Sequence, residues 1–313
     1  MRSWRFHEFG DISNLRLEDI PTPEPGAGEI LVRVQFAALN PEDQYLVRRL
    51  YPRAGKPPFA VGRDGSGTVA AVGPETKGHF AVGDPVVLLR SDVGVSREGT
   101  LADYVTVPEA SLAALPKDWT FQEGAAGPLV FLTAWQALVD QGQLKAGENV
   151  LITVALSRSK KKRAALNKLG AHVVIDTESR TLEGEVRAGL RGEPVHLVVE
   201  NLGGEILEKC LRMMSFRGRI QVVGLLSGLT SEIQLGLVIH KCLKIQGISM
   251  GAYTAAKSAK IWAEVVKTLE RAGKRPLVDR AFDAESVQAA FAHMAKGPLG
   301  KVLVDFRDDP ANE

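Results

Sequence analysis

The sequence predicts an α/β protein with a barrel-like, β-rich domain and a second domain built on a parallel sheet. Short apolar runs lie between glycines over the first 120 residues, which is typical of short strands. From residue 144 onward, apolar strands alternate with helices, and this alternation favours a parallel sheet covered on both faces. A chain of 313 residues is long enough for two cores. We assign residues 1–121 and 273–313 to the first domain and 122–272 to the second.

The strands of the first domain follow from alternating and short apolar patterns. Residues 29–36 alternate between apolar and polar side chains, and residues 68–72 and 86–89 are short apolar runs. The pattern changes at residues 122–141, which predict a pair of helices, and residues 300–306 predict one more strand.

In the second domain, strands and helices are expected in turn. The expected strands are residues 150–153, 173–175, 197–200, 219–223 and 243–247. The expected helices are residues 161–169, 182–188, 206–214 and 258–272.

Composition excludes several classes of protein. The 39 basic and 37 acidic residues nearly balance, so nothing favours a nucleic-acid partner. Cys210 and Cys242 are too few for a disulfide framework, and we expect two buried thiols. Neither a secretory signal nor a run of about 18 apolar residues is present. We therefore expect a cytoplasmic protein without a membrane partner.

The most unusual feature of the chain is the segment after Thr153. Residues 147–153 (GENVLIT) are typical of a turn and first strand that lead into a Gly-x-Gly-x-x-Gly phosphate turn. The next residues are VALSRSKKKR, which are typical of the end of a second strand and its basic turn, and no glycine lies between Gly147 and Gly170. Compared with a complete domain of this kind, a turn, a helix and a strand of about 20–25 residues are missing. If this is a real deletion, the sheet is expected to be shortened by one βα unit.

The simplest arrangement of the shortened domain uses residues 149–155 as one strand. The helix at 161–169 then makes a right-handed crossover to the strand at 173–175. In a continuous chain, the Cα atoms of Thr153 and Val154 lie about 3.8 Å apart.

Five motifs point to one family. They are LNP at 39–41, GRDGSGTVAAVG at 62–73, VGDPV at 82–86, GTLADY at 99–104 and LTAWQAL at 132–138. In this order and spacing, the chain resembles the zinc-independent quinone oxidoreductases of the medium-chain dehydrogenase/reductase superfamily, from residue 1 to 306 except after Thr153. The resemblance implies a GroES-like barrel, a Rossmann-type domain and a last strand that returns to the first domain.

The zinc-dependent branch of the superfamily needs residues that this chain lacks. That branch has a cysteine near Asn40 and a histidine where this chain has Arg63. The six histidines do not cluster at ligand spacing. We therefore expect no metal.

The resemblance also implies an acceptor cleft in the first domain. Asn40 and Thr133 match positions near the nicotinamide and its ribose, while Tyr45 and Tyr51 match two tyrosines of the cleft. Tyr51 further matches a proton-donating tyrosine of 2-enoyl thioester reductases, and a phenol is a suitable donor to an enolate. Alternatively, both tyrosines lie in surface loops, and Asn40 is a turn residue before Pro41.

The basic segment after the gap favours NADPH over NADH. In the family, Ser, Lys or Arg residues at this turn take the 2′-phosphate, whereas NAD enzymes place an acid there. A serine could also cap the following helix. The alternative is a solvated helix face. The candidates are Ser157, Arg158, Ser159 and Lys162.

Later strand ends supply further cofactor candidates, since a dinucleotide lies at the carboxyl ends of parallel strands. These are Asn201, Gly203, Gly224, Leu225, Gly251 and, in the last strand, Lys301. Each glycine could instead serve a turn.

The resemblance implies an NADPH-dependent, zinc-free enzyme that reduces small quinones or α,β-unsaturated carbonyls. Two alternatives remain: a 2-enoyl thioester reductase, and a non-catalytic binding or scaffold protein that has lost its dinucleotide site. By analogy with the family, we expect a homodimer joined through residues 243–247.

Overall fold

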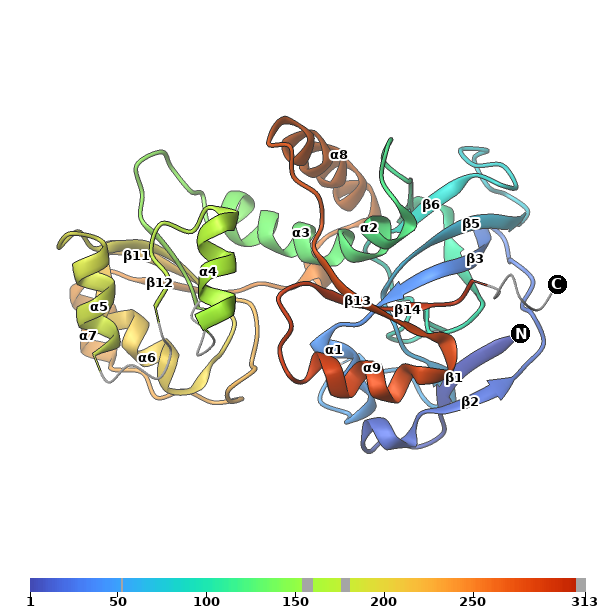
Figure 1. The fold of residues 1–313 in the computed structure, drawn as a ribbon, viewed down its shortest axis with the longest axis horizontal. Helices are drawn as coiled ribbons and strands as arrows, with labels where there is room; N and C mark the ends of the chain where they lie inside the picture. Colours follow the sequence, from blue (N-terminus) through green and yellow to red (C-terminus); the bar gives the residue numbers. More distant parts are fainter. Residues whose placement is uncertain (52, 154–159, 176–180, 308–313) are drawn as a thin grey trace. The chain divides into compact units, whose positions relative to one another are not determined.

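The computed structural model describes residues 1–51, 53–153, 160–175 and 181–307. The chain divides into two compact units, the first made of Met1–Leu132 and Met250–Glu313 and the second of Thr133–Ser249. The first unit is β-rich and the second contains a parallel sheet with helices (Figure 1). The α/β class is as predicted. Residues 122–132 and 250–272, which were predicted in the second domain, belong to the first unit.

The first unit contains most of the strands. They are β1 (Arg2–Phe6), β2 (Arg16–Asp19), β3 (Glu29–Ala38), β4 (Phe59–Ala60), β5 (Asp64–Val72), β6 (Pro85–Leu88), β7 (Tyr104–Pro108), β8 (Leu112–Ala114), β13 (Val278–Asp283) and β14 (Lys301–Asp305). Its helical segments are η1 (Ile12–Asn14), α1 (Pro41–Val47), η2 (Glu109–Ser111), α2 (Phe121–Ala126), η5 (Met250–Ala252), α8 (Ala255–Arg271), η6 (Ala284–Ser286) and α9 (Val287–Met294). Helix α3 (Pro128–Trp135) crosses the division between the units.

Strand β3 is the centre of the larger sheet, whose order is β13-β14-β3-β5-β6-β8 with β7 also paired to β3. The last strand, β14, pairs antiparallel with β3, and Leu303 lies opposite Ala38. This return of the tail to the first domain was predicted. A smaller sheet has the order β2-β1-β4.

A large apolar core lies in the first unit, beside a smaller cluster that includes Phe36 and Leu303. Alternate residues of β3, including Ile30, Val32 and Val34, are 0–1% exposed and belong to this core. Helix α9 contributes Val287 and Phe291 to the same cluster. Burial of one face of β3 explains the alternation in its sequence.

The second unit alternates strands and helices. Its elements are the π-helical turn η3 (Gln136–Asp140), β9 (Val150–Ile152), α4 (Lys160–Leu169), α5 (Leu182–Gly189), β10 (Val195–Glu200), α6 (Gly204–Met213), β11 (Met214–Val222), α7 (Leu235–His240) and β12 (Lys244–Gly247). The four strands are parallel in the order β12-β11-β10-β9.

Helices α5 and α6 pack together beside this sheet (Figure 1). Leu182 and Val186 of α5 and Leu207 of α6 share one core with Val198 of β10 and Ile220 of β11. The predicted helices and four of the five predicted strands are therefore present.

The prediction of a strand at residues 173–175 is wrong, because these residues have no strand structure. Ile175 is 6% exposed and packs in the core with Leu182. Its apolar character therefore reflects core burial. Within the described residues β9 pairs with β10 alone, and helix α4 forms as predicted although the strand expected after it does not. The Thr153–Val154 junction lies outside the described residues.

The two cysteines differ in environment. Cys210 of α6 is 0% exposed, and burial raises the pKa of its thiol. Cys242 is exposed, so the prediction of two buried thiols is wrong for this residue. It follows α7 in the turn before β12, where its backbone φ is +50°. In the described part of the chain, no helix combines the length and apolarity needed to cross a membrane.

Candidate active site

Asn40 lies at the junction of β3 and α1, where it precedes the helix and is 4% exposed. The helix begins here because Asn is a favoured N-cap and Pro41 suits the first helical position. The Asp43 carboxylate accepts the Asn40 backbone N–H at 2.8 Å. The turn role considered for Asn40 is thus present. Its cofactor role stays a prediction.

The side chain of Asn40 belongs to a buried polar network. Its Nδ2 donates to Asp64 Oδ2 at 3.1 Å, and its Oδ1 accepts from the Lys301 ammonium group. Lys301 Nζ also donates to Asp64 Oδ2 at 3.1 Å and to the Leu39 carbonyl at 3.2 Å. Two residues predicted from strand and motif positions, Asn40 and Lys301, are therefore in direct contact.

Asp43 carries a strongly perturbed carboxyl group. Burial raises its pKa to about 7, and the neighbouring Glu42 carboxylate acts in the same direction. The hydrogen bond from Asn40 and the charges of Lys301 and Arg63 act against this rise. Among the described residues, Asp43 Oδ1 is buried without a hydrogen-bond partner. The group therefore exchanges its proton near neutral pH.

Arg63 forms the second buried group of this unit. Its guanidinium donates to Glu42 Oε1 at 2.6 Å, to Tyr51 Oη at 3.2 Å and to the Ser91 carbonyl at 3.4 Å. Burial lowers the pKa of the Arg63 guanidinium, but Glu42, Tyr51 and Asp43 together more than offset this and raise the pKa overall. Arg63 is 8% exposed and carries a fixed positive charge.

By the resemblance described above, Arg63 is expected at the position where the zinc-dependent branch has a histidine. Across the described ranges, no three His, Cys, Asp or Glu side chains gather as metal ligands. The groups around Arg63 are a carboxylate, a phenol and a carbonyl, which suit a guanidinium.

The tyrosines come from the helix α1 region. Tyr45 lies in α1 and Tyr51 lies after it, and both are half-buried. Tyr51 also packs against the apolar core of the first unit. Part of each tyrosine is therefore buried, which fits the cleft prediction and the surface-loop alternative alike.

Gly251 lies in η5 of the first unit. Arg90 donates to the Gly251 carbonyl at 3.4 Å and to the Met250 carbonyl at 3.2 Å. These bonds fix the carbonyls of the short helix, so Gly251 presents a constrained backbone.

In the second unit, a polar network closes the carboxyl ends of β9 and β10. The Thr153 hydroxyl donates to Glu200 Oε1 at 3.1 Å and accepts the Asn201 N–H at 2.8 Å. Glu200 is 0% exposed, and its carboxylate accepts the backbone N–H groups of Leu202 and Gly203, each at 2.8 Å. Asn201 is thereby held by its backbone at the end of β10.

The predicted glycines of this unit make close backbone contacts between two loops. Gly203 has φ +72°, and a Cβ added there would lie 2.5 Å from the Gly228 carbonyl oxygen. A Cβ on Gly224 would lie 2.7 Å from the Asn201 carbonyl oxygen. Leu225, the next predicted residue, is 40% exposed. Packing between the loops after β10 and β11 therefore accounts for both glycines, as the turn alternative proposed.

The remaining cofactor candidates are only partly described. Ser157, Arg158 and Ser159 lie outside the described residues. Lys162 is half-buried on α4, and Thr133 is half-buried on α3. The sequence therefore brings a basic residue to the helix that follows β9.

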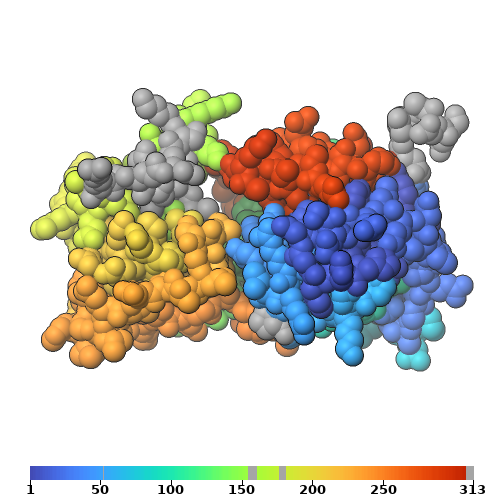
Figure 2. Space-filling view, turned by 90° about the horizontal axis from the view of Figure 1, so that it is seen from below, coloured from blue at the N-terminus to red at the C-terminus, as the bar shows by residue number. Residues whose placement is uncertain are grey.

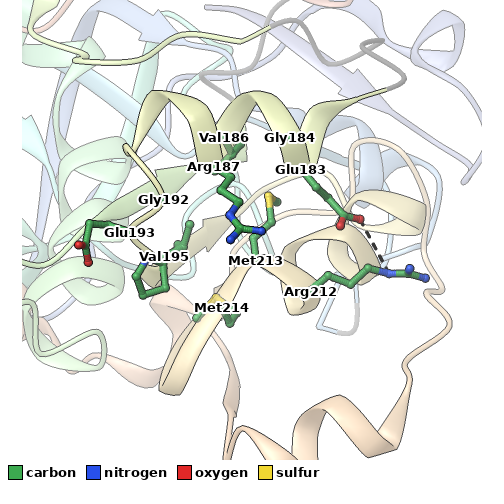
Figure 3. Close-up of a pocket in the computed structure, with 11 residues that line it drawn as sticks. Glu183, Gly184, Val186, Arg187, Gly192, Glu193, Val195, Arg212, Met213 and Met214 are labelled. Atoms are coloured by element: carbon green, nitrogen blue, oxygen red, sulfur yellow. Dashed lines mark ion pairs between the residues drawn. The ribbon is translucent and has the colours of Figure 1, made fainter.

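A cavity of about 450 Å³ opens at the other end of the parallel sheet (Figure 3). Val195 begins β10 and Met214 begins β11, and both line it. Arg212 and Glu183 also line it and form an ion pair, with Nε of Arg212 3.8 Å from Oε1 of Glu183. None of the predicted site residues lines this cavity, so it is separate from the candidate active site.

Sequence reasoning missed three charged residues whose hydrogen bonds hold Arg63 or the predicted site residues of the first unit. They are Glu42, Asp64 and Arg90. The signal for two of them was present in the predicted motifs, because Glu42 follows Asn40-Pro41 and Asp64 follows Arg63. Charged residues inside glycine-rich, apolar motifs are expected to be paired when buried.

Two protein-family models match this chain. The alcohol dehydrogenase GroES-like domain matches residues 26–117, and the zinc-binding dehydrogenase model matches residues 145–271. The chain belongs to the medium-chain dehydrogenase/reductase superfamily. The second model's description names zinc, and the absence of zinc from this chain stays a prediction.

Curated members of the medium-chain dehydrogenase/reductase superfamily align with almost the whole chain. Quinone oxidoreductase of Lama guanicoe is 27% identical over 328 residues, with 97% of each chain covered. A zinc-type alcohol dehydrogenase-like protein of Schizosaccharomyces pombe is 26% identical over 341 residues, covering 95% of this chain and 96% of the relative.

Solved structures of the superfamily share this fold. An NAD-dependent alcohol dehydrogenase superposes with a TM-score of 0.86 at 29% identity, covering 97% of this chain and 99% of the other. A mycobacterial protein complexed with NADPH has a TM-score of 0.85 at 25% identity, with the same coverage.

The alignment lengths bear on the segment missing after Thr153. For the Lama guanicoe enzyme, 97% of 313 residues is about 304, so about 24 of the 328 aligned positions have no residue of this chain. These positions are counted over the whole alignment, so the loss of a turn, a helix and a strand after Thr153 stays a prediction.

Proposed function

We propose that this superfamily member is an NADPH-dependent, zinc-free oxidoreductase that reduces small quinones or α,β-unsaturated carbonyls. One observation carries the proposal. Tyr51 Oη accepts a hydrogen bond from Arg63, and within the described residues it has no acceptor for its own proton. A half-buried phenol in this arrangement can donate its proton to the oxygen of a conjugated carbonyl.

The chemistry needs little more from the first unit. A bound reduced nicotinamide would supply hydride to a conjugated acceptor, which itself delocalises the charge. Tyr51 then orients and protonates the acceptor oxygen. The buried network of Asn40, Asp64 and Lys301 holds the start of α1, the helix that precedes Tyr51. The half-buried ring of Tyr45 adds apolar surface for a planar acceptor.

The residues present fit an NADPH molecule unequally. Lys162, and by sequence Arg158, offer positive charge for a 2′-phosphate. The glycine turn that would hold the pyrophosphate is absent from the sequence. The backbone N–H groups of Leu202 and Gly203 already donate to the buried Glu200 carboxylate, so they are not available to a pyrophosphate. We therefore expect weak NADPH binding.

Titration with NADPH tests the cofactor part of the proposal. We expect saturable quenching of tryptophan fluorescence by NADPH that weakens in Lys162→Ala, with Lys267→Ala on α8 as a matched exposed lysine. NADPH oxidation is then measured with a small quinone, an enone and an enoyl thioester. Turnover of the thioester alone would favour the 2-enoyl thioester reductase alternative.

A second candidate function rests on the missing phosphate turn. A chain that cannot hold the pyrophosphate could keep the cleft and act as a non-catalytic binding protein. No saturable NADPH binding up to millimolar concentration, together with no turnover, would favour this function over the enzyme.

We also propose a homodimer formed through β12. This strand is exposed along its length, and it pairs with β11 alone among the described residues. Large apolar side chains on and near it are exposed, including Ile245 at 36%, Ile239 at 69% and Leu235 at 70%. The space-filling view shows this orange-coloured segment at the surface (Figure 2). Such a strand edge is able to pair with a second copy.

A further inference from the structure

Arg63 and Tyr51 form a pair whose chemistry goes beyond packing. Arg63 Nη1 lies 3.2 Å from Tyr51 Oη and 2.6 Å from Glu42 Oε1. The guanidinium carbon also lies 5.8 Å from the centre of the Tyr51 ring. One buried cation therefore contacts the oxygen and the ring of the same tyrosine.

The direction of this hydrogen bond determines what the phenol can do. Arg63 can only donate, so the Tyr51 oxygen accepts and its own proton points elsewhere. When the O–H bond of Tyr51 breaks, a new O–H bond forms on the acceptor oxygen. The phenolate left beside Arg63 later regains a proton from water. A fixed positive charge within hydrogen-bond distance stabilises that phenolate.

We propose that Arg63 is the positioning residue of Tyr51, and that through Tyr51 it provides the polarisation of a carbonyl acceptor that a metal provides in the zinc-dependent branch. This inference rests on the proposed function. Glu42 accepts from the same guanidinium nitrogen, Nη1, that donates to Tyr51, with 27% of the Glu42 side chain exposed. Ser91 adds a carbonyl acceptor at 3.4 Å, so the guanidinium is held in one orientation.

An NMR measurement tests the contact without any need for activity. The protein is labelled with ¹³C at tyrosine Cζ, and the Tyr51 signal is assigned by its absence in Tyr51→Phe. Arg63→Met is expected to move the Tyr51 signal, while Arg63→Lys, which keeps a charged donor, moves it less. Arg2→Met, which removes an arginine paired with Asp103 and Glu285, should leave it in place. An unmoved Tyr51 signal in a folded Arg63→Met protein would overturn the inference.

A double-mutant cycle tests the catalytic consequence. Arg63→Met should lower kcat for enone reduction by about tenfold to a hundredfold with a smaller change in KM, and Arg63→Lys should recover part of the loss. In the Tyr51→Phe background, Arg63→Met should cause no further loss. Equal losses in both backgrounds would show that Arg63 does not act through Tyr51. A wild-type protein without turnover would refute the proposed function and the catalytic role of Arg63, while the NMR result would still judge the contact.

Discussion

Lys301 and Asp64 form a buried ion pair between the last strand and β5, with Nζ 3.1 Å from Oδ2 and side-chain exposures of 12% and 2%. The two residues are 237 positions apart in the sequence. The Leu129 N–H also donates to Asp64, at 3.1 Å to Oδ1. The carboxylate therefore joins β14, α1 and α3 to one point in the core of the first unit.

Removal of one partner of this pair should cost more than removal of both. Lys301→Met leaves the Asp64 charge buried, and we expect a loss of about 3–5 kcal/mol in unfolding free energy, measured by urea titration. Lys301→Met combined with Asp64→Asn should lose less than the sum of the single changes. Lys267→Met removes an exposed pair with Glu264 and should cost less than about 1 kcal/mol. Strict additivity would contradict this prediction.

Asp43 should make stability depend on pH. Its pKa is raised from 3.8 to about 7 in the folded protein, so the folded state binds more protons than the unfolded state between these values. Unfolding free energy should therefore fall as pH rises from about 4 to 7 and level off above. Asp43→Asn should flatten this fall by on the order of 4 kcal/mol.

The Asp43 experiment compares urea titrations of wild type and Asp43→Asn at several pH values. Asn keeps an oxygen to accept the Asn40 N–H, so the start of α1 is retained. Asp92→Asn, at an exposed carboxylate of the first unit, serves as the control. Identical pH slopes in wild type and Asp43→Asn would rule out the perturbed group.

The two thiols should react at very different rates. Cys242 is exposed and Cys210 is fully buried in α6, with its pKa raised by burial. We expect one fast-reacting thiol in the native protein with an aromatic disulfide reagent, and two after denaturation. Cys242→Ser should abolish the fast phase. Its persistence in that variant would show that Cys210 is accessible.

Gly203 should contribute to the stability of the fold whether or not a nucleotide binds. Gly203→Ala places a Cβ 2.5 Å from the Gly228 carbonyl oxygen at φ +72°, and we expect a loss of about 1–3 kcal/mol in unfolding free energy. Gly236→Ala, in α7 with no atom closer than 4.0 Å, should instead be neutral or stabilising. Thermal unfolding of both variants without added nucleotide makes the comparison.

Strand β12 should control the association of two copies. Ile245→Lys adds a charge to the exposed strand, so we expect the dimer to dissociate, as measured by light scattering coupled to size-exclusion chromatography. Lys244→Glu serves as the control, because it changes an exposed residue of the same strand that is already charged and so leaves the apolar side chains in place. A wild-type protein that runs as a monomer at micromolar concentration would refute the proposed dimer.

Much of the secondary structure was predictable, because periodicity reports which faces of an element are buried. The alternation at β3 and the apolar runs at β10, β11 and β14 each correspond to strands whose side chains enter a core. Residues 173–175 carried the same apolar signal without strand pairing. Only Ile175 of this run is buried, against α5, while Val173 is 37% exposed. A short apolar run therefore does not by itself identify a strand.

The sequence by itself determined that the chain has a β-rich part and an α/β part, and that no glycine lies between Gly147 and Gly170. These are properties of local order and residue type. Only the tertiary structure decided that Arg63 donates to Tyr51 and that Lys301 pairs with Asp64. Such pairs join residues far apart in the chain. Their partners are set by which strands the core brings together, because a buried charge takes the nearest group that can satisfy it.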